Sequence, residues 1–86
     1  MEVDRFRELF YYDDGVLRSK VNYYSWRVGK AVGHTHGNGI PRIKWDDHTY
    51  AINKISYFLV TDLWPRRLMH IDGDRTNNRV ENLREY

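Results

Sequence analysis

The stretch His70-Ile-Asp-Gly-Asp-Arg-Thr-Asn-Asn-Arg-Val-Glu-Asn-Leu-Arg-Glu-Tyr86 decides how this chain folds. It begins inside a short apolar run, residues 68–71, which predicts a strand. Asp72-Gly73-Asp74 is a turn signal, because short Asx side chains bond their own backbone and tolerate tight turns. A polar loop around Asn77-Asn78 follows. Residues 83–86 are then able to return as the partner strand, so the stretch predicts a hairpin with a long polar loop.

The residues before this hairpin predict one helix. Asn53 is a suitable N-cap, and Trp64-Pro65 should end the helix, because proline disfavours the helical conformation in the residue before it. We therefore expect a helix from Lys54 to Asp62. The apolar residues that recur on one face at helical spacing are Ile55, Phe58, Leu59 and Leu63.

The first third of the chain predicts β-structure. Residues 9–12 form an apolar, aromatic run, and Asp13-Asp14-Gly15 is a turn signal followed by Val16 and Leu17, so a hairpin is expected here. Residues 26–32 are a candidate for a further strand, which Gly33 would close.

A second hairpin is expected in the middle of the chain. Residues 40–45 and 49–52 are its strands, with a turn at Asp46-Asp47. Pro41 places the first of these strands at a sheet edge, since proline cannot donate a ladder hydrogen bond. Residues 34–39, which precede this hairpin, have the composition of a loop.

Length and composition restrict the class of protein. The chain has 86 residues, which is enough for one domain with a single core. It has no cysteine, so it can form neither a disulfide framework nor a thiolate metal site. No apolar run approaches the ~20 residues that cross a bilayer, and the N-terminus lacks a signal-peptide pattern. We expect a protein of the cytoplasm, the host cell's cytoplasm if it is viral, with no membrane partner.

The charge is small in sum, +2, but unevenly distributed. Between Gly15 and Trp45 there is no acidic residue, and Tyr23, Tyr24 and Trp26 alternate with cations there. This pattern is consistent with a surface that faces phosphate, and equally with a solvated sheet face whose aromatic side chains point into the core. The cations of this segment are Arg18, Lys20, Arg27, Lys30, Arg42 and Lys44.

The chain from Val32 onward resembles the phage-type HNH homing endonuclease family. The resemblance implies a single domain over residues 1–86, in which residues 32–86 are an HNH-like core and residues 1–31 are an N-terminal β region. The fold class it implies is α+β, with N-terminal β-hairpins, one helix and a truncated HNH ββα-like motif. The matching residues are Trp64-Pro65, His70-Ile71, Gly73-Asp74-Arg75, Asn77-Asn78-Arg79 and Asn82-Leu83-Arg84.

The resemblance implies phosphodiester hydrolysis assisted by one Mg²⁺ or Mn²⁺ ion. His70 would be the general base, since histidine titrates nearest neutral pH. Asn82 would pin the loop that carries this base, and Asn78 would brace the turn. The cation would screen the charge that develops on the phosphate and the leaving oxygen. Asp72 and Asp74 are expected to be turn residues.

This chain departs from the family pattern at three places. Met69 stands where the family has a metal-ligating Asp or His, and a soft, neutral thioether is a poor ligand for Mg²⁺ or Mn²⁺. The family's second ligand lies on a helix after the final strand, and the chain stops at Tyr86. The usual Ala-His-Arg start of the helix reads Ile52-Asn53-Lys54. Met69 itself is expected to be a core residue of its strand.

These departures favour a nuclease-derived domain without its metal centre and with no cofactor. We expect it to bind DNA or to block a nucleoprotein complex of a bacterial host, such as a CRISPR nuclease. The near-neutral charge argues against a DNA mimic. The alternative is an active endonuclease or nickase that uses His70 with Mg²⁺ or Mn²⁺. In that case a homodimer would supply the missing ligand in trans, the 86 residues would be a fragment of a longer protein that carries it, or Asp72 and Asp74 would substitute for it after the turn is remodelled.

The remaining polar residues have two interpretations each. His34, His36 and His48 would form a zinc site only with a fourth ligand from elsewhere, and ordinary loop histidines are the commoner case. Trp64 is expected to be a packing anchor. The arginines beside and within the signature are candidates for phosphate contacts or for surface ion pairs, and these are Arg66, Arg67, Arg75, Arg79 and Arg84.

Overall fold

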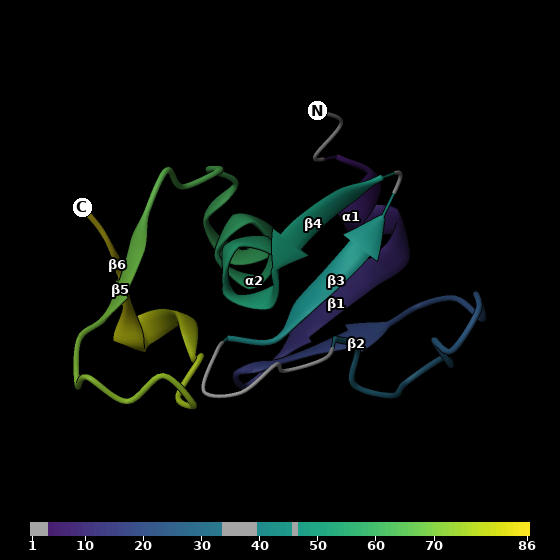
Figure 1. Ribbon diagram of the computed structural model, residues 1–86, viewed down its shortest axis with the longest axis horizontal. Coiled ribbons are helices and arrows are strands. Elements are labelled where there is room, and N and C mark those ends of the chain that lie inside the picture. Colours follow the sequence, from purple (N-terminus) through teal and green to yellow (C-terminus); the bar gives the residue numbers. More distant parts are fainter. Residues whose placement is uncertain (1–3, 34–39, 46) are drawn as a thin grey trace.

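The computed structural model describes residues 4–33, 40–45 and 47–86, and it is a small α+β fold of three antiparallel hairpins and one main helix (Figure 1). This confirms the predicted α+β class. Each hairpin is a separate two-stranded sheet. In chain order the elements are α1 (Arg5–Leu9), β1 (Phe10–Asp13), β2 (Val16–Ser19), β3 (Arg42–Trp45), β4 (His48–Ala51), α2 (Ile52–Thr61), β5 (Leu68–His70), the 3-10 helix η1 (Val80–Asn82) and β6 (Leu83–Glu85).

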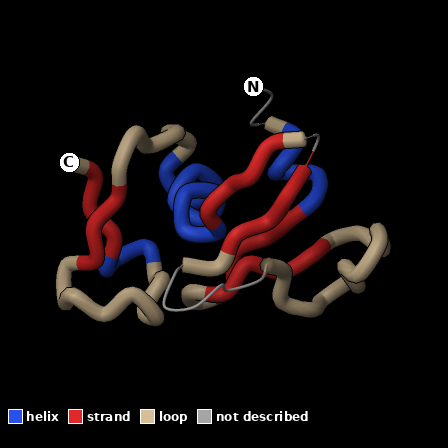
Figure 2. Tube along the Cα trace, viewed as in Figure 1, coloured by secondary structure: helices blue, strands red, loops and turns tan. Residues whose placement is uncertain are grey.

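Helix α2 occupies the middle of the molecule. Figure 2 shows the β5–β6 hairpin on one side of it and the β1–β2 and β3–β4 hairpins on the other. The main core fills the space between α2 and these two N-terminal hairpins, because their apolar side chains face one another. Its buried members are Phe6, Leu9, Phe10, Leu17, Val32, Ile43, Tyr50, Ile52 and Ile55. Among the described helices, none has the length and apolar character needed to cross a membrane.

The first helix, α1, was not predicted from the sequence. It has five residues, too few for a hydrophobic period to show. Phe6 is 1% exposed and stacks on Trp64 at 5.9 Å between ring centroids. Arg7 forms an ion pair with Asp62 and lies 4.7 Å above the Phe58 ring. Tertiary packing, rather than local propensity, therefore holds this helix in place.

Helix α2 begins and ends earlier than predicted. It starts at Ile52 after Ala51, so Asn53 is not the N-cap but lies within the first turn, 2% exposed. It ends at Thr61, because Asp62 adopts a left-handed conformation with φ 64° and its N–H bonds to the Phe58 oxygen at 2.8 Å. The predicted last residue, Asp62, is therefore the C-cap, one position beyond the helix, and Asp62 rather than Trp64-Pro65 ends it. Leu63 lies beyond the helix and is 61% exposed.

Residues 26–32 do not form the predicted strand. They make isolated bridges instead, Ser19 with Val28 and Arg18 with Ala31. Gly29 has a positive φ of 81°, which breaks the extended conformation between these two bridges. The segment consequently lies beside β2 as irregular chain.

The predicted central hairpin is confirmed, with strands of 42–45 and 48–51. Ile43 pairs with Tyr50, and both side chains are buried, while Arg42 and Lys44 point outward on the same strand. Gly33 has φ +105°, and a Cβ there would lie 2.9 Å from the Ile52 side chain, so only glycine fits. His34, His36 and Asp46, named in the sequence predictions, lie outside the described residues.

Candidate functional site

The predicted C-terminal hairpin is confirmed and presents a polar loop. His70 pairs with Leu83, Met69 with Arg84 and Leu68 with Glu85. Two backbone hydrogen bonds close the near end of the loop, from the Ile71 N–H to the Asn82 oxygen at 2.8 Å and from the Gly73 N–H to the His70 oxygen at 3.0 Å. The loop is therefore anchored to the strand that carries His70.

Asn82 ties the loop together with its side-chain amide. Its Oδ1 accepts a hydrogen bond from the Asp72 N–H at 3.1 Å. Its Nδ2 donates to Asp72 Oδ1 at 2.9 Å and to the Asn77 carbonyl oxygen at 3.0 Å. The residue is only 9% exposed. These contacts have the geometry of the pinning role that the family resemblance gives to Asn82.

Asn78 contacts the imidazole of His70 directly. Asn78 Oδ1 lies 2.7 Å from His70 Nε2, and the Asn78 Nδ2 donates a long hydrogen bond of 3.4 Å to the Arg75 oxygen. In the neutral tautomer that donates from Nε2 to this amide oxygen, Nδ1 keeps a lone pair. An imidazole fixed in this tautomer is able to accept a proton at Nδ1. Asn78 thus orients the ring as well as bracing the turn.

Asp72 and Asp74 are turn residues, as predicted. Hydrogen bonds from Asn77, from the Asp74 N–H and from Asn82 lower the pKa of Asp72. Hydrogen bonds from the hydroxyl and N–H of Thr76 lower the pKa of Asp74. Both carboxylates therefore hold the loop as charged acceptors.

Acid should loosen this loop. The pKa of Asp72 is lower in the folded state, so the stability from its ionised form is fully present above the usual Asp value of about 3.9 and is lost as the pH falls through the folded-state pKa. Carboxyl-carbon NMR should show Asp72 titrating below that value, with the Asn82 side-chain amide signals moving in step. Asp72→Asn should remove this coupled step. An ordinary Asp72 midpoint with unchanged Asn82 signals would contradict the expectation.

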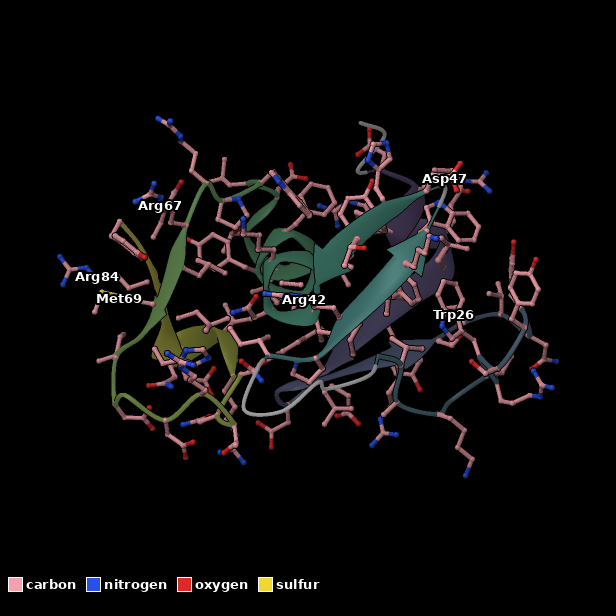
Figure 3. The ribbon with its side chains drawn as sticks, viewed as in Figure 1. Trp26, Arg42, Asp47, Arg67, Met69 and Arg84 are labelled. Carbon is pink, nitrogen blue, oxygen red and sulfur yellow. The ribbon has the colours of Figure 1, made fainter. Side chains whose placement is uncertain are left out.

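Met69 is not the core residue that was predicted. It is 43% exposed. Successive side chains of a strand point to opposite faces, so Met69 points away from the face of His70. Figure 3 shows Met69 with Arg84 and Arg67 at the outer edge of the hairpin. Within residues 4–33, 40–45 and 47–86, no three His, Cys, Asp or Glu side chains are grouped so as to hold a metal ion.

Four of the predicted phosphate-binding cations contact the protein itself. Arg18 pairs with Asp13 at 2.8 Å and Arg79 with Asp14 at 2.9 Å, which raises the pKa of Arg79. Lys20 donates to the Arg7 oxygen at 2.8 Å. The fourth, Arg27, bonds to carbonyl oxygens of its own turn. These cations stabilise the fold. Arg79 does so through Asp14 of the first hairpin and not through an acidic residue of the signature.

The other predicted cations make no side-chain ion pair or hydrogen bond to another described residue, and Arg84 belongs with them. They do not gather into one patch, since Arg42 lies over the middle of the molecule and Arg67 and Arg84 at the β5–β6 end (Figure 3). The full set is Lys30, Arg42, Lys44, Arg66, Arg67, Arg75 and Arg84.

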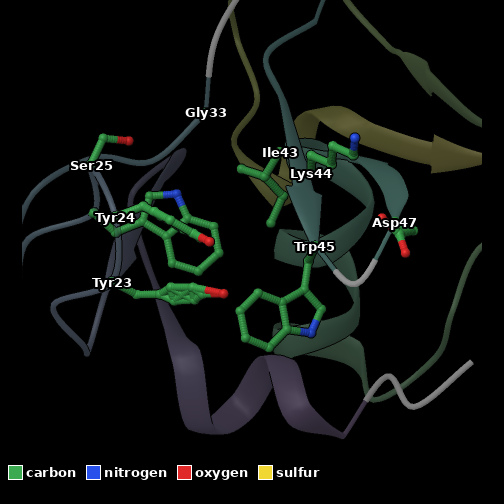
Figure 4. A pocket seen from close by; sticks show the side chains of 9 residues that line it. Tyr23, Tyr24, Ser25, Gly33, Ile43, Lys44, Trp45 and Asp47 are labelled. Atoms are coloured by element: carbon green, nitrogen blue, oxygen red, sulfur yellow. The ribbon is translucent and has the colours of Figure 1, made fainter.

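The aromatic residues among the N-terminal cations form a cluster rather than a phosphate-facing row. Trp26 stacks on Trp45 at 5.7 Å, and Tyr23 meets Trp45 edge-on at 5.2 Å between ring centroids. Both tryptophans pack against the core, beside a 620 Å³ cavity (Figure 4). Partial burial and the neighbouring Tyr24 raise the pKa of Tyr23. Tyr24, 86% exposed, is the member most open to solvent.

Sequence reasoning missed the support that the N-terminal hairpin gives to the loop. The Tyr12 hydroxyl accepts a hydrogen bond from the Val80 N–H at 2.9 Å, and Asp14 holds Arg79. The partners lie more than sixty positions apart in the chain, so no local pattern signals them.

The chain was also compared with known proteins. No protein-family model matches it, and neither a curated protein nor a solved structure is significantly similar to it. The HNH resemblance therefore rests on the residues of the signature and stays a prediction.

Proposed function

We propose that this chain is an HNH-type domain that binds DNA without cutting it. One observation carries the proposal: the loop that would position a catalytic histidine is held by the side-chain hydrogen bonds of Asn82, while the adjoining ligand position, Met69, holds an outward-facing thioether. Met69 offers no oxygen donor, and Asp72 and Asp74 are engaged in the turn. The described residues thus do not fit a hard dication, which prefers oxygen ligands.

The outward face of the β5–β6 hairpin supplies groups for phosphate. Arg84 stands opposite Met69 in the register, and Arg67 precedes β5, with its carbonyl oxygen accepting from the Tyr86 N–H at 3.2 Å. Neither guanidinium has a carboxylate partner among the described residues. Arginine binds phosphate oxygens through a planar, bidentate fork. This face is therefore suited to the backbone of a nucleic acid.

A second function, metal-dependent cleavage, is favoured by one observation. Asn78 holds His70 through Nε2, and in the neutral tautomer that donates from Nε2 the other nitrogen, Nδ1, is a proton acceptor. A general base requires that arrangement. Metal-dependent cleavage would also need oxygen ligands for the metal, and the described residues do not group such ligands together. A second copy of the chain or a rebuilt turn would have to supply them.

Binding and cleavage are separable by experiment. With labelled duplex DNA, affinity should fall steeply with salt, and the Arg67→Gln/Arg84→Gln double variant should reduce the slope of log K against log salt by about 1.8, about 0.9 for each lost phosphate contact. Arg18→Gln is the matched control, because Arg18 pairs with Asp13 and should leave the slope unchanged. EDTA should not alter binding.

The cleavage assay uses supercoiled plasmid with Mg²⁺ or Mn²⁺. We expect no nicking by the native protein. Metal-dependent nicking that disappears in His70→Ala would establish the second function instead. No DNA binding at low salt would overturn the proposal and direct the search to a protein target, such as a host nucleoprotein complex.

A further inference from the structure

We propose that the N-terminal end of α2, together with Arg42 of β3, forms a phosphate-binding site separate from the His70 loop. A groove of 680 Å³ lies here, and its lining includes Arg42, His48, Asn53 and Lys54. None of the described residues that line it is acidic. Where the phosphate belongs to DNA, the inference rests on the proposed function.

The helix end is open to an anion. Helix α2 has ten residues, its N-cap Ala51 provides no side-chain hydrogen bond, and its first turn has no acidic residue. The Ile52 N–H bonds to the Pro41 oxygen at 2.9 Å, whereas no described oxygen outside the helix bonds to the N–H groups of Asn53 and Lys54. Unpaired N–H groups and the positive end of the helix dipole attract anions.

Asn53 provides a second, independent sign of a ligand. It is only 2% exposed, yet its side-chain amide makes no hydrogen bond to a described residue. Asn53 lines the groove, and among the described side chains it is Ser56 Oγ, on the next turn of the same helix, that is sealed from solvent without a partner. Buried polar groups are hydrogen-bonded as a rule. A bound oxyanion would accept the missing bond from the Asn53 amide.

The surrounding charges favour phosphate. Arg42 points outward from β3, with no ion pair to a described residue, and Figure 3 shows it over the middle of the molecule near α2. Lys54 lies in the first turn of α2, and its Nζ donates to the Arg66 oxygen at 2.9 Å, which fixes the ammonium at the rim. A guanidinium fork and two backbone N–H groups that share one groove suit the oxygens of a phosphate.

The groove also reaches the start of the strand that carries His70. Leu68, the first residue of β5, lines it beside Trp64. A nucleic-acid backbone that contacts Arg67 on the hairpin would reach Arg42 with a more distant phosphate by following this groove. We infer a phosphodiester of that backbone as the natural ligand.

The test is an amide NMR titration with inorganic phosphate and, separately, with a short DNA duplex, against sodium chloride of equal ionic strength. Both ligands should shift the backbone N–H signals of Asn53 and Lys54 and the Asn53 side-chain amide. Arg42→Gln should weaken phosphate binding about tenfold, since it removes a charge-assisted contact. Lys44→Gln is the matched control, because Lys44 is on the same exposed face of β3 but does not line this groove.

The outcomes separate this inference from the proposed function. Shifts with phosphate and with DNA, both weakened by Arg42→Gln in a variant of native melting temperature, support the site as described. Shifts with phosphate alone support the site and overturn the DNA backbone as its ligand. Absence of phosphate-specific shifts at Asn53 and Lys54 overturns the site, even if DNA still binds through Arg67 and Arg84.

Discussion

Phe6→Ala should lower the free energy of unfolding by about 3–5 kcal/mol, the usual cost of deleting a buried phenyl ring. Phe6 is 1% exposed and contacts three other aromatic rings in different elements. Its centroid lies 4.9 Å from Tyr50, 5.9 Å from Trp64 and 6.1 Å from Phe10. The truncation would open a cavity where α1, α2 and two hairpins meet, and a small domain has only about 5–15 kcal/mol in total.

Urea denaturation followed by tryptophan fluorescence would measure this change. Phe6→Leu is the control, because it keeps most of the apolar volume and should lose less than half as much stability. A loss below about 1 kcal/mol in Phe6→Ala, well under the range for buried phenyl rings, would mean that α1 does not dock as described.

Asn82→Ala should cost about 2–4 kcal/mol, because three side-chain hydrogen bonds disappear from a residue that is 9% exposed. The Asp72 N–H and the Asn77 oxygen would lose partners within the loop. We also expect the His70 ring signals to broaden or move in NMR spectra, since the loop that presents Asn78 to the ring would lose its anchor.

Asn77→Ala is the matched control for this variant. Asn77 donates to Asp72 Oδ2 at 3.0 Å from a more exposed position, so its loss should cost only about 0.5–1.5 kcal/mol. Equal costs for the two variants would show that Asn82 is not the anchor of the loop.

The hairpins were predictable because their signals are local. Asp13-Asp14-Gly15 supplies positive φ values of 45° at Asp14 and 91° at Gly15, and the flanking strands pair in register around it. The central and C-terminal hairpins likewise follow from apolar runs around turn residues. The centre of α2 was predicted from its apolar spacing, and its last residue was predicted to within one position, but its start was placed two residues too late because Asn53 was taken as the N-cap.

The failures have a common physical cause in tertiary contacts. Helix α1 depends on rings contributed by other elements, and five residues cannot show a period. Residues 26–32 look extended by composition, yet a turn at Gly29 interrupts them. Met69 was predicted to be a core residue because its side chain is apolar. One face of β5 is open to solvent, and the alternation of side chains along the strand puts Met69 on that face.

In the candidate site, the contacts that could be predicted from the signature are those within the single loop between β5 and β6. Asn82, Asp72 and Asp74 make the turn-closing bonds that their residue types favour. The Asn78 bond to His70 was not predicted, because it depends on how the loop folds back over β5. The groove at the start of α2 was missed as well, since Arg42 comes to line it with Asn53 only because the β3–β4 hairpin pairs Arg42 with Ala51.

The clamp between Asp14 and Arg79, with Tyr12 holding the Val80 N–H, makes the two ends of the chain mechanically interdependent. The signature residues are therefore not expected to keep their structure when they are moved into another protein alone. Transplanted without the first hairpin, they would leave behind both the clamp and the Leu17 and Phe10 side chains that help bury the inner surface of α2. A variant designed to keep the signature loop therefore has to keep the β1–β2 hairpin as well.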